Sequence, residues 1–114
     1  MDWITLGQIS DLDRIDLESH DYPVLIFKHS TRCSISSTAL NRIRSARPGE
    51  LGEDTVVYVL DLLTLRPVSD AIATRYGIHH ESPQAILIRH GKPVYHASHL
   101  AIMPAEIRQA ASIS

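Results

Sequence analysis

The sequence predicts an α/β fold with a mixed sheet of about five strands, a βαβαβ half followed by a ββα half, and helices on both faces. Three observations lead to this fold class. Short β-branched apolar runs alternate along the chain with amphipathic stretches of helical period. Two of the runs are apolar at successive positions, as strands buried on both faces are. A glycine-containing turn between the last two runs suits a hairpin.

The chain opens with a short apolar strand at residues 3–6. Residues 8–17 follow as a predicted helix, because Ile9, Leu12 and Ile15 recur at intervals of three and would form one apolar stripe. The acidic residues of this stretch are expected on its solvated face; they are Asp11, Asp13, Asp16 and Glu18.

The second strand is the continuous apolar run from Val24 to Phe27, which starts after Tyr22-Pro23 and ends at Lys28-His29. A run of this kind indicates a strand in the middle of an α/β sheet. Residues 33–46 then form a predicted helix. Its expected inward positions are Ile35, Leu40 and Ile43, and its expected stop is Pro48-Gly49.

The second half begins with a β-branched strand at residues 55–60. Residues 66–76 form a predicted helix, with Pro67 in its first turn and Gly77 as its C-terminal cap. The predicted hairpin has strands at residues 85–89 and 94–97 and a turn at 90–93, and Pro104 opens the last helix.

Length and charge restrict the classes of protein to which the chain can belong. Its 114 residues predict a single domain over 1–114. We expect this domain to be a monomer or a weak dimer, although the sequence does not identify the oligomeric state. Eleven Lys and Arg against thirteen Asp and Glu give a net charge of -2, which argues against a nucleic-acid or membrane partner. The N-terminus has neither a basic leader nor an apolar signal segment, so we expect a cytoplasmic protein.

The single cysteine, Cys33, lies where a buried strand gives way to a helix. It excludes an internal disulfide and a zinc site built mainly of thiolates. Unpaired N–H groups at a helix N-terminus favour the thiolate, which is the nucleophilic form. Arg32 adds a cation, and Ser36 is placed to donate its hydroxyl to the sulfur. The alternative is an inert buried cysteine, which the polar neighbours of Cys33 disfavour.

A proline also precedes a predicted strand, in Glu81-Ser82-Pro83-Gln84. Such a proline is either an ordinary edge residue or a cis-proline, and we predict that Pro83 is cis.

Together these two features resemble a known family. Cys-Ser-Ile-Ser at residues 33–36 resembles the C-x-x-C/S motif of thioredoxin-like proteins, and Pro83 resembles their cis-proline. More narrowly, Phe-Lys-His-Ser-Thr-Arg-Cys at 27–33 and His-Glu-Ser-Pro-Gln at 80–84 resemble the monothiol bacilliredoxins, the bacillithiol-system YtxJ family. That family commonly has Cys-Pro-Ile-Ser, where this chain has Ser34 in place of the proline.

The resemblance implies thiol–disulfide exchange by one cysteine, with Cys33 and Ser36 as the catalytic pair. Cys33 would remove bacillithiol from client proteins, and because Ser36 stands in the resolving position, an external thiol must complete the cycle. Bacillithiol would be a co-substrate, and no cofactor would be bound. The resemblance also places Pro83 against Cys33, with the backbone of Ser82 pairing the substrate like a short strand.

Bacillithiol carries a malate and a glucosamine amine, so its site needs cations and an acceptor. Arg32 and His80 are candidates for the carboxylates and Glu81 for the amine, whereas Lys28 would either support the site or extend to solvent. The expected substrate-binding residues are Thr31, Arg32, Ser34, Ile35, His80, Ser82 and Pro83.

Other functions compete with this interpretation. A glutaredoxin-like protein would use a different small thiol, and a non-catalytic stress or redox-sensing interaction protein would use Cys33 only as a sensor. Seven histidines raise the question of a metal, but no metal-binding spacing occurs and we expect no metal site. A bridged iron–sulfur cluster is a minor alternative.

Overall fold

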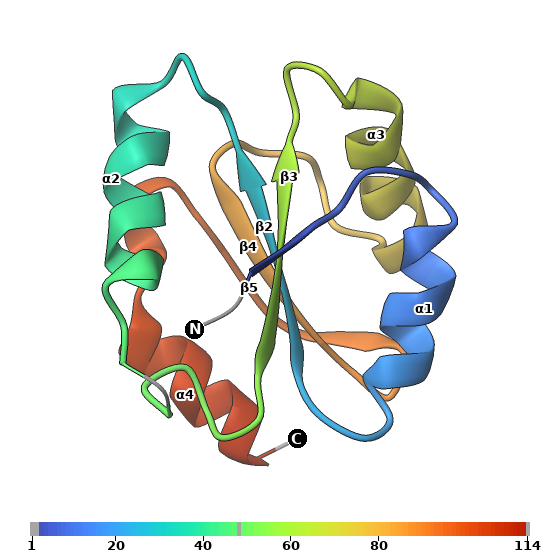
Figure 1. The fold of residues 1–114 in the computed structure, drawn as a ribbon, viewed down its shortest axis with the longest axis vertical. Helices are drawn as coiled ribbons and strands as arrows, with labels where there is room; N and C mark the ends of the chain where they lie inside the picture. Colours follow the sequence, from blue (N-terminus) through green and yellow to red (C-terminus); the bar gives the residue numbers. More distant parts are fainter. Residues whose placement is uncertain (1–2, 48, 114) are drawn as a thin grey trace.

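A computed structural model describes residues 3–47 and 49–113 of the chain. At its centre is a five-stranded mixed sheet in the order β1-β3-β2-β4-β5 (Figure 1). The strands are β1 (Trp3–Thr5), β2 (Val24–His29), β3 (Val56–Asp61), β4 (Gln84–Arg89) and β5 (Lys92–Ser98). β3 pairs in parallel with β1 and β2, whereas β4 is antiparallel to β2 and β5. The predicted order of strands and helices is confirmed.

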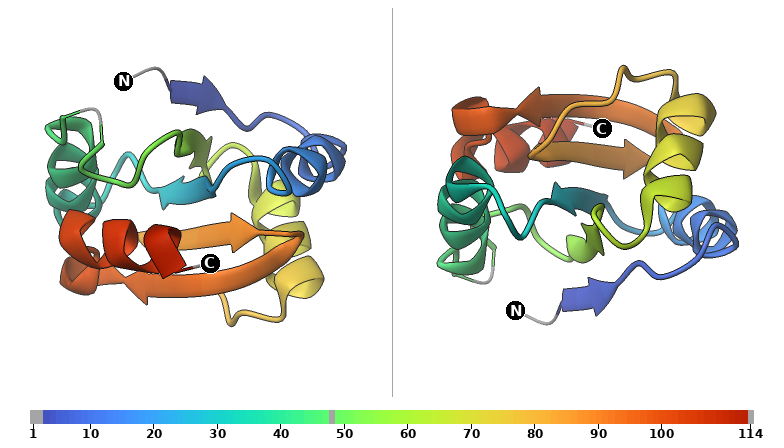
Figure 2. Two further views of the ribbon diagram at one scale, coloured as in Figure 1. Left: turned by 90° about the horizontal axis from the view of Figure 1, so that it is seen from below. Right: turned by 90° about the horizontal axis from the view of Figure 1, so that it is seen from above.

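Two pairs of helices cover the sheet. Figure 2 shows α1 and α3 on one face and α2 and α4 on the other. The prediction of helices on both faces is confirmed. None of the described helices is long and apolar enough to cross a membrane. The helices are α1 (Asp11–Glu18), α2 (Ser34–Arg44), α3 (Arg66–Tyr76) and α4 (Pro104–Ile113), with a short 3₁₀ helix, η1 (His99–Ala101), before α4.

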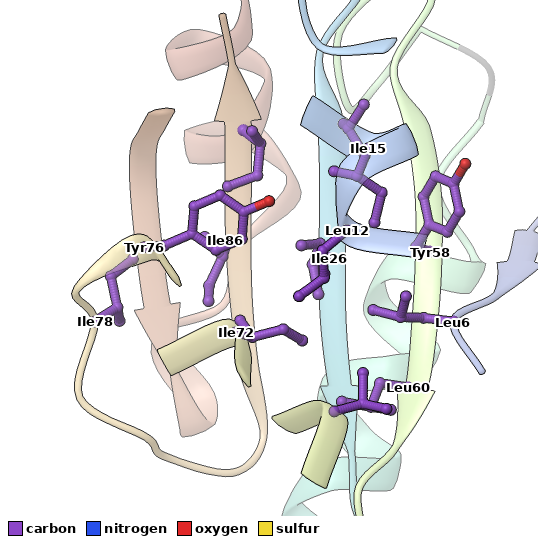
Figure 3. Close-up of a cluster of buried hydrophobic side chains, with 13 residues drawn as sticks. Leu6, Leu12, Ile15, Ile26, Tyr58, Leu60, Ile72, Tyr76, Ile78 and Ile86 are labelled. Atoms are coloured by element: carbon purple, nitrogen blue, oxygen red, sulfur yellow. The ribbon is translucent and has the colours of Figure 1, made fainter. Parts of the chain in front are cut away.

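Alternation along β2 divides the core into two layers. Val24 and Ile26 pack with residues of α1 and α3 (Figure 3), whereas Leu25 and Phe27 pack with residues of α2 and α4. All four side chains are fully buried, as the continuous apolar run predicts. Because side chains of a strand point alternately to its two faces, the next residues, Lys28 and His29, also go to opposite sides.

The first helix begins three residues later than predicted, at Asp11. The buried Asp11 carboxylate accepts hydrogen bonds from the N–H groups of Gly7 and Gln8, at 3.1 and 3.2 Å, and so holds a turn ahead of the helix. Ile9 therefore lies outside the helix and is 49% exposed. Its predicted place in the apolar stripe is wrong, although Leu12 and Ile15 are fully buried.

The acidic residues of α1 are mostly not a solvated face, contrary to expectation. Asp16 accepts a hydrogen bond from the hydroxyl of Tyr76 at 2.6 Å, and Glu18 accepts hydrogen bonds from the hydroxyls of Tyr22 and Tyr58. The Glu18 carboxylate and burial raise the pKa of Tyr22 to about 12. Carboxylates at these positions tie α1 to α3 and to the sheet. Only Asp13, exposed and paired with Arg75 at 2.9 Å, fits the expectation in part.

Turns and caps follow the sequence closely. Gly77 caps α3 in the left-handed conformation, with φ +66°, as predicted. The β4–β5 turn needs only His90 and Gly91, both with positive φ, so β5 begins at Lys92 rather than at residue 94.

Four residues to which predictions apply lie outside the described part of the chain. They are Met1 and Asp2 of the predicted leader-free start, Pro48 of the predicted helix stop, and Ser114 at the predicted domain end.

Candidate active site

Cys33 is the N-cap residue of α2, at the predicted strand-to-helix turn. Its backbone is extended, with φ -109° and ψ 121°; its N–H donates to Ser30 O at 3.2 Å, and its carbonyl accepts from Ser37 N at 3.1 Å. The thiol is half-buried. This placement gives the sulfur access to a partner and sets Cys33 beside the positive end of the helix.

Ser36 is fully buried, and its hydroxyl is engaged by the loop that precedes Cys33. The N–H of Ser30 donates to Ser36 Oγ at 2.9 Å, and Ser36 Oγ lies 2.7 Å from His29 Nδ1. Contrary to the expectation from the sequence, no hydrogen bond among the described residues joins Ser36 to the Cys33 sulfur. The reason is that Ser36 faces the sheet, together with Ala39 and Ile43 of the same helix.

Ile35 is the exposed neighbour of this buried serine. The sequence predicts it as an inward position of α2, but it is 42% exposed, so that prediction is wrong. The inward face of α2 begins instead at Ser36, because a helix presents every third or fourth residue to its core. Ile35 therefore lies on the outer surface of the first turn, two residues after Cys33.

His29 is a residue of this site to which the sequence analysis gave no role. It pairs with Asp61 across β2–β3, and burial lowers the pKa of its imidazole, with Arg44 adding to the effect and Asp61 opposing it. A neutral His29 with its proton on Nε2 accepts the hydroxyl proton of Ser36 at Nδ1, and this tautomer satisfies both groups. The sequence feature that could have indicated this role is the position of His29, a polar residue at the end of an apolar strand and four residues before Cys33.

Pro83 lies in the turn that leads into β4, and the Ser82-Pro83 peptide bond is cis, as predicted. Pro83 is buried, and its carbonyl accepts the N–H of His99 at 2.9 Å. The side chain of Gln84 donates from Nε2 to His79 O at 3.0 Å. The hydroxyl of Ser82 and the Oε1 of Gln84 are buried without a hydrogen-bond partner among the described residues. These contacts link the turn to η1 and to its own upstream segment.

Lys28 does not extend to solvent; its side chain is 0% exposed. Its Nζ donates to Ser69 O at 3.4 Å and lies 3.3 Å from His80 Nδ1, which is also 3.2 Å from Ser69 Oγ. Burial lowers the pKa of Lys28 to about 8. Burial and the charge of Lys28 lower the pKa of His80. Lys28 therefore supports the segment before Pro83, and the Nδ1 of His80 is occupied inside the protein.

The remaining candidates lie at the surface around Cys33. Thr31, Arg32 and Ser34 are exposed, and the side chains of Thr31 and Arg32 make no hydrogen bond within the described residues. Arg32 is thus free to meet an anion. Glu81 is half-buried and pairs with His99, with 3.7 Å between Oε2 and Nδ1. Within residues 3–47 and 49–113, no three His, Cys, Asp or Glu side chains gather as a metal site would need.

The profile of one protein family, described as monothiol bacilliredoxin BrxC, matches residues 4–107. The chain belongs to the monothiol bacilliredoxin family. The resemblance seen in residues 27–33 and 80–84 is therefore confirmed, and the match extends over nearly the whole chain.

Solved structures place this bacilliredoxin in the thioredoxin fold. A thioredoxin-fold protein provisionally described as an oxidoreductase superposes with a TM-score of 0.78 at 29% identity, over 95% of this chain and 92% of that one. Thioredoxin from Fasciola hepatica gives 0.70 at 14% identity, over 96% and 97% of the two chains. A mutant thioredoxin from Halobacterium salinarum gives 0.67 at 15%, over 98% and 89%. The predicted thioredoxin-like fold is confirmed, and family and fold together indicate a thiol redox function.

Proposed function

We propose that this bacilliredoxin removes bacillithiol from protein mixed disulfides, with Cys33 as the attacking thiol. The observation that carries the proposal is the half-buried sulfur of Cys33 at the N-cap of α2. The chain has no second thiol, and the hydroxyl of Ser36 is hydrogen-bonded to His29 and Ser30 rather than to the sulfur. A relay within the chain is therefore impossible, and the partner sulfur comes from outside.

The exchange takes place in two balanced steps. The Cys33 thiolate attacks the bacillithiol sulfur of the client's mixed disulfide, a new sulfur–sulfur bond forms, and the client leaves as a thiolate that takes up a proton. The client cysteine is thereby reduced and Cys33 is oxidised. A second low-molecular-weight thiolate then attacks the disulfide on Cys33, releases Cys33 as a thiolate and carries bacillithiol away as a mixed disulfide. Cys33 ends each cycle unchanged.

The surroundings of Cys33 supply what each step needs. The first turn of α2 presents backbone N–H groups and the positive end of the helix to a thiolate, both as attacking group and as leaving group. Arg32, the residue before Cys33, is exposed and provides a cation for a bacillithiol carboxylate. An extended client segment would pair with the backbone at Ser82, next to the buried Pro83. We propose the reducing cytoplasm as the compartment, where a lone thiol persists.

The test follows the release of bacillithiol from a bacillithiolated client by the wild type and by Cys33→Ala, with free bacillithiol as the second thiol. We expect wild-type turnover and a loss of at least about 100-fold in the variant, because the nucleophile is removed. The same assay, with a client that carries glutathione instead of bacillithiol, tests the glutaredoxin-like alternative. A faster reaction with glutathione would favour a glutaredoxin-like protein, and the absence of turnover with either thiol would favour a sensor or interaction protein.

A further inference from the structure

A cavity of about 450 Å³ lies beside the Pro83 turn, between the segment that follows α3 and the edge strand β5. Its volume falls within the range of about 300–1,000 Å³ that is usual for small-molecule sites. Its polar lining residues are His79, Glu81, Gln84, His96, Ser98 and His99.

The lining contains a buried acceptor that has no partner. Gln84 is only 1% exposed; its Nε2 donates to His79 O, and its Oε1 has no hydrogen bond among the described residues. A buried carbonyl oxygen without a partner costs free energy, so a ligand that donates a proton to it would be favoured. Glu81 adds a charged acceptor at the same cavity.

The rest of the lining provides donors. His79, His96 and His99 line the cavity, and the imidazole ring of each can donate an N–H to a carboxylate. His99 also joins the cavity to the candidate active site, because its backbone N–H donates to Pro83 O and its ring pairs with Glu81. The lining of the cavity therefore contains both acceptors and imidazole donors, and two of these groups, Glu81 and His99, already pair with each other.

The register of the sheet brings this cavity to the end of the molecule that carries Cys33. Gln84 pairs with Lys28 across β2–β4, and β2 ends at His29, four residues before Cys33. Cys33 and the cavity therefore lie toward the same end of the sheet, and the hydrogen bond between His99 and Pro83 joins the cavity lining to the Pro83 turn.

We propose that this cavity binds the polar part of bacillithiol, an amino sugar that carries a malate. This inference rests on the proposed function. The hydroxyls of the sugar match the acceptors Gln84 Oε1 and Glu81, and a malate carboxylate matches the imidazoles of His79, His96 and His99. Ordinary protein thiols and simple alkyl thiols lack both groups, so the cavity provides selectivity for the sugar thiol.

The direct experiment adds the thiol-free glycoside, glucosaminyl malate, to the protein and follows the histidine ring resonances by NMR. We expect the resonances of His79, His96 and His99 to shift in a saturable way. Those of His20 and His90, whose rings lie together at the turn of the hairpin, 5.7 Å apart, serve as internal controls and stay in place. Shifts confined to His20 and His90, or none at millimolar ligand, would overturn the inference.

A kinetic experiment tests selectivity. Glu81→Gln and His96→Ala should each raise the KM for a bacillithiol mixed disulfide roughly tenfold, the loss expected for one charge-assisted hydrogen bond. The KM for a mercaptoethanol mixed disulfide should stay within twofold, and the control His90→Ala should change neither. Equal changes with both disulfides, or no change, would count against the cavity as the site that selects bacillithiol.

The two experiments distinguish the inference from the proposed function. Saturable histidine shifts in a protein that exchanges no bacillithiol would refute the proposed function alone. Rapid exchange without those shifts would refute the inference alone.

Discussion

Two consecutive residues at the end of β2 form two different polar clusters on opposite faces of the sheet. On the α2 face, His29 joins Ser36 and the N–H of Ser30 in a network of groups that are uncharged when His29 is neutral. On the α3 face, Lys28 carries a cation into the interior and contacts Ser69 and His80. The first cluster holds the turn that contains Cys33, and the second holds the segment before Pro83.

The difference between the clusters shows how the two turns of the candidate site are stabilised. The cluster around Ser36 pairs its buried donors and acceptors, and it should contribute to stability. Among the described residues no carboxylate is hydrogen-bonded to Lys28. Burial lowers the pKa of Lys28 to about 8, with the charge of Asp70 opposing the effect and that of Arg66 adding to it. Such a charge destabilises the fold, so Lys28 is better explained by a role at the site than by stability.

The largest expected effect comes from Lys28→Met, which keeps the length of the side chain and removes its charge. The pKa of about 8 lies well below the unfolded value of 10.5, so the unfolded chain binds more protons between these two values. The penalty is complete below pH 8 and disappears as the pH rises towards 10.5. At about 1.4 kcal/mol per pKa unit, and after the lost hydrogen bonds are subtracted, the variant should be more stable by roughly 2 kcal/mol at pH 7.

Chemical denaturation at pH 7 and at pH 10 measures this prediction. The gain from Lys28→Met should shrink at pH 10, where Lys28 of the wild type has lost its proton. Lys92 is exposed, so Lys92→Met is the matched control and should change stability by less than about 0.5 kcal/mol. A loss of stability in Lys28→Met at pH 7 would contradict the contrast between the two clusters.

A smaller effect of opposite sign is expected for Ser36→Ala. This change leaves the N–H of Ser30 and the Nδ1 of His29 without their partner, which should lower the free energy of unfolding by about 1–2 kcal/mol. The neighbouring Ser37 is exposed, and Ser37→Ala should lie within about 0.5 kcal/mol of the wild type. If denaturant melts gave equal stabilities for the two variants, the Ser36 network would be energetically unimportant.

The smallest effect concerns the protonation of His29. The pKa of His29 is lowered by burial and by Arg44, against the pull of Asp61, so the unfolded chain takes up a proton first as the pH falls below about 6.5. This contribution to stability is present above that pH and is lost on acidification. His29→Asn should therefore flatten the decline in stability between pH 7.5 and 5.5, whereas exposed His20→Asn should not. Parallel pH profiles of the wild type and His29→Asn would contradict this.

Much of the fold could be predicted because local patterns dictate it. Val24–Phe27 is apolar at every position, and only a strand covered on both faces satisfies that pattern. The turn at Cys33 and the Pro83 turn were predicted from single residues next to such strands. The position of Ile35 was mispredicted because the phase of α2 depends on where the helix starts, and Ser36, a polar residue, occupies the inward position.

The partners of buried polar groups were the part that the sequence did not reveal. Nothing in the spacing of Lys28, Ser69 and His80 indicates that they meet, since α3 brings Ser69 from 41 residues away. The same holds for Glu18, whose tyrosine partner Tyr58 comes from β3, 40 residues along the chain. Local periodicity cannot report such pairings, because they depend on how helices cross the sheet. The role of His29 was missed although its partner Ser36 is only seven residues away, because spacing alone does not show that the two side chains meet.

The most direct test of a one-thiol mechanism is the intact mass of the protein after exposure to bacillithiol disulfide at pH 7. We predict one added bacillithiol per chain, mapped by peptide analysis to Cys33, removed by excess bacillithiol and absent in Cys33→Ala. An unmodified Cys33 between pH 6 and pH 8, under conditions in which a small unhindered thiol reacts, would contradict the account.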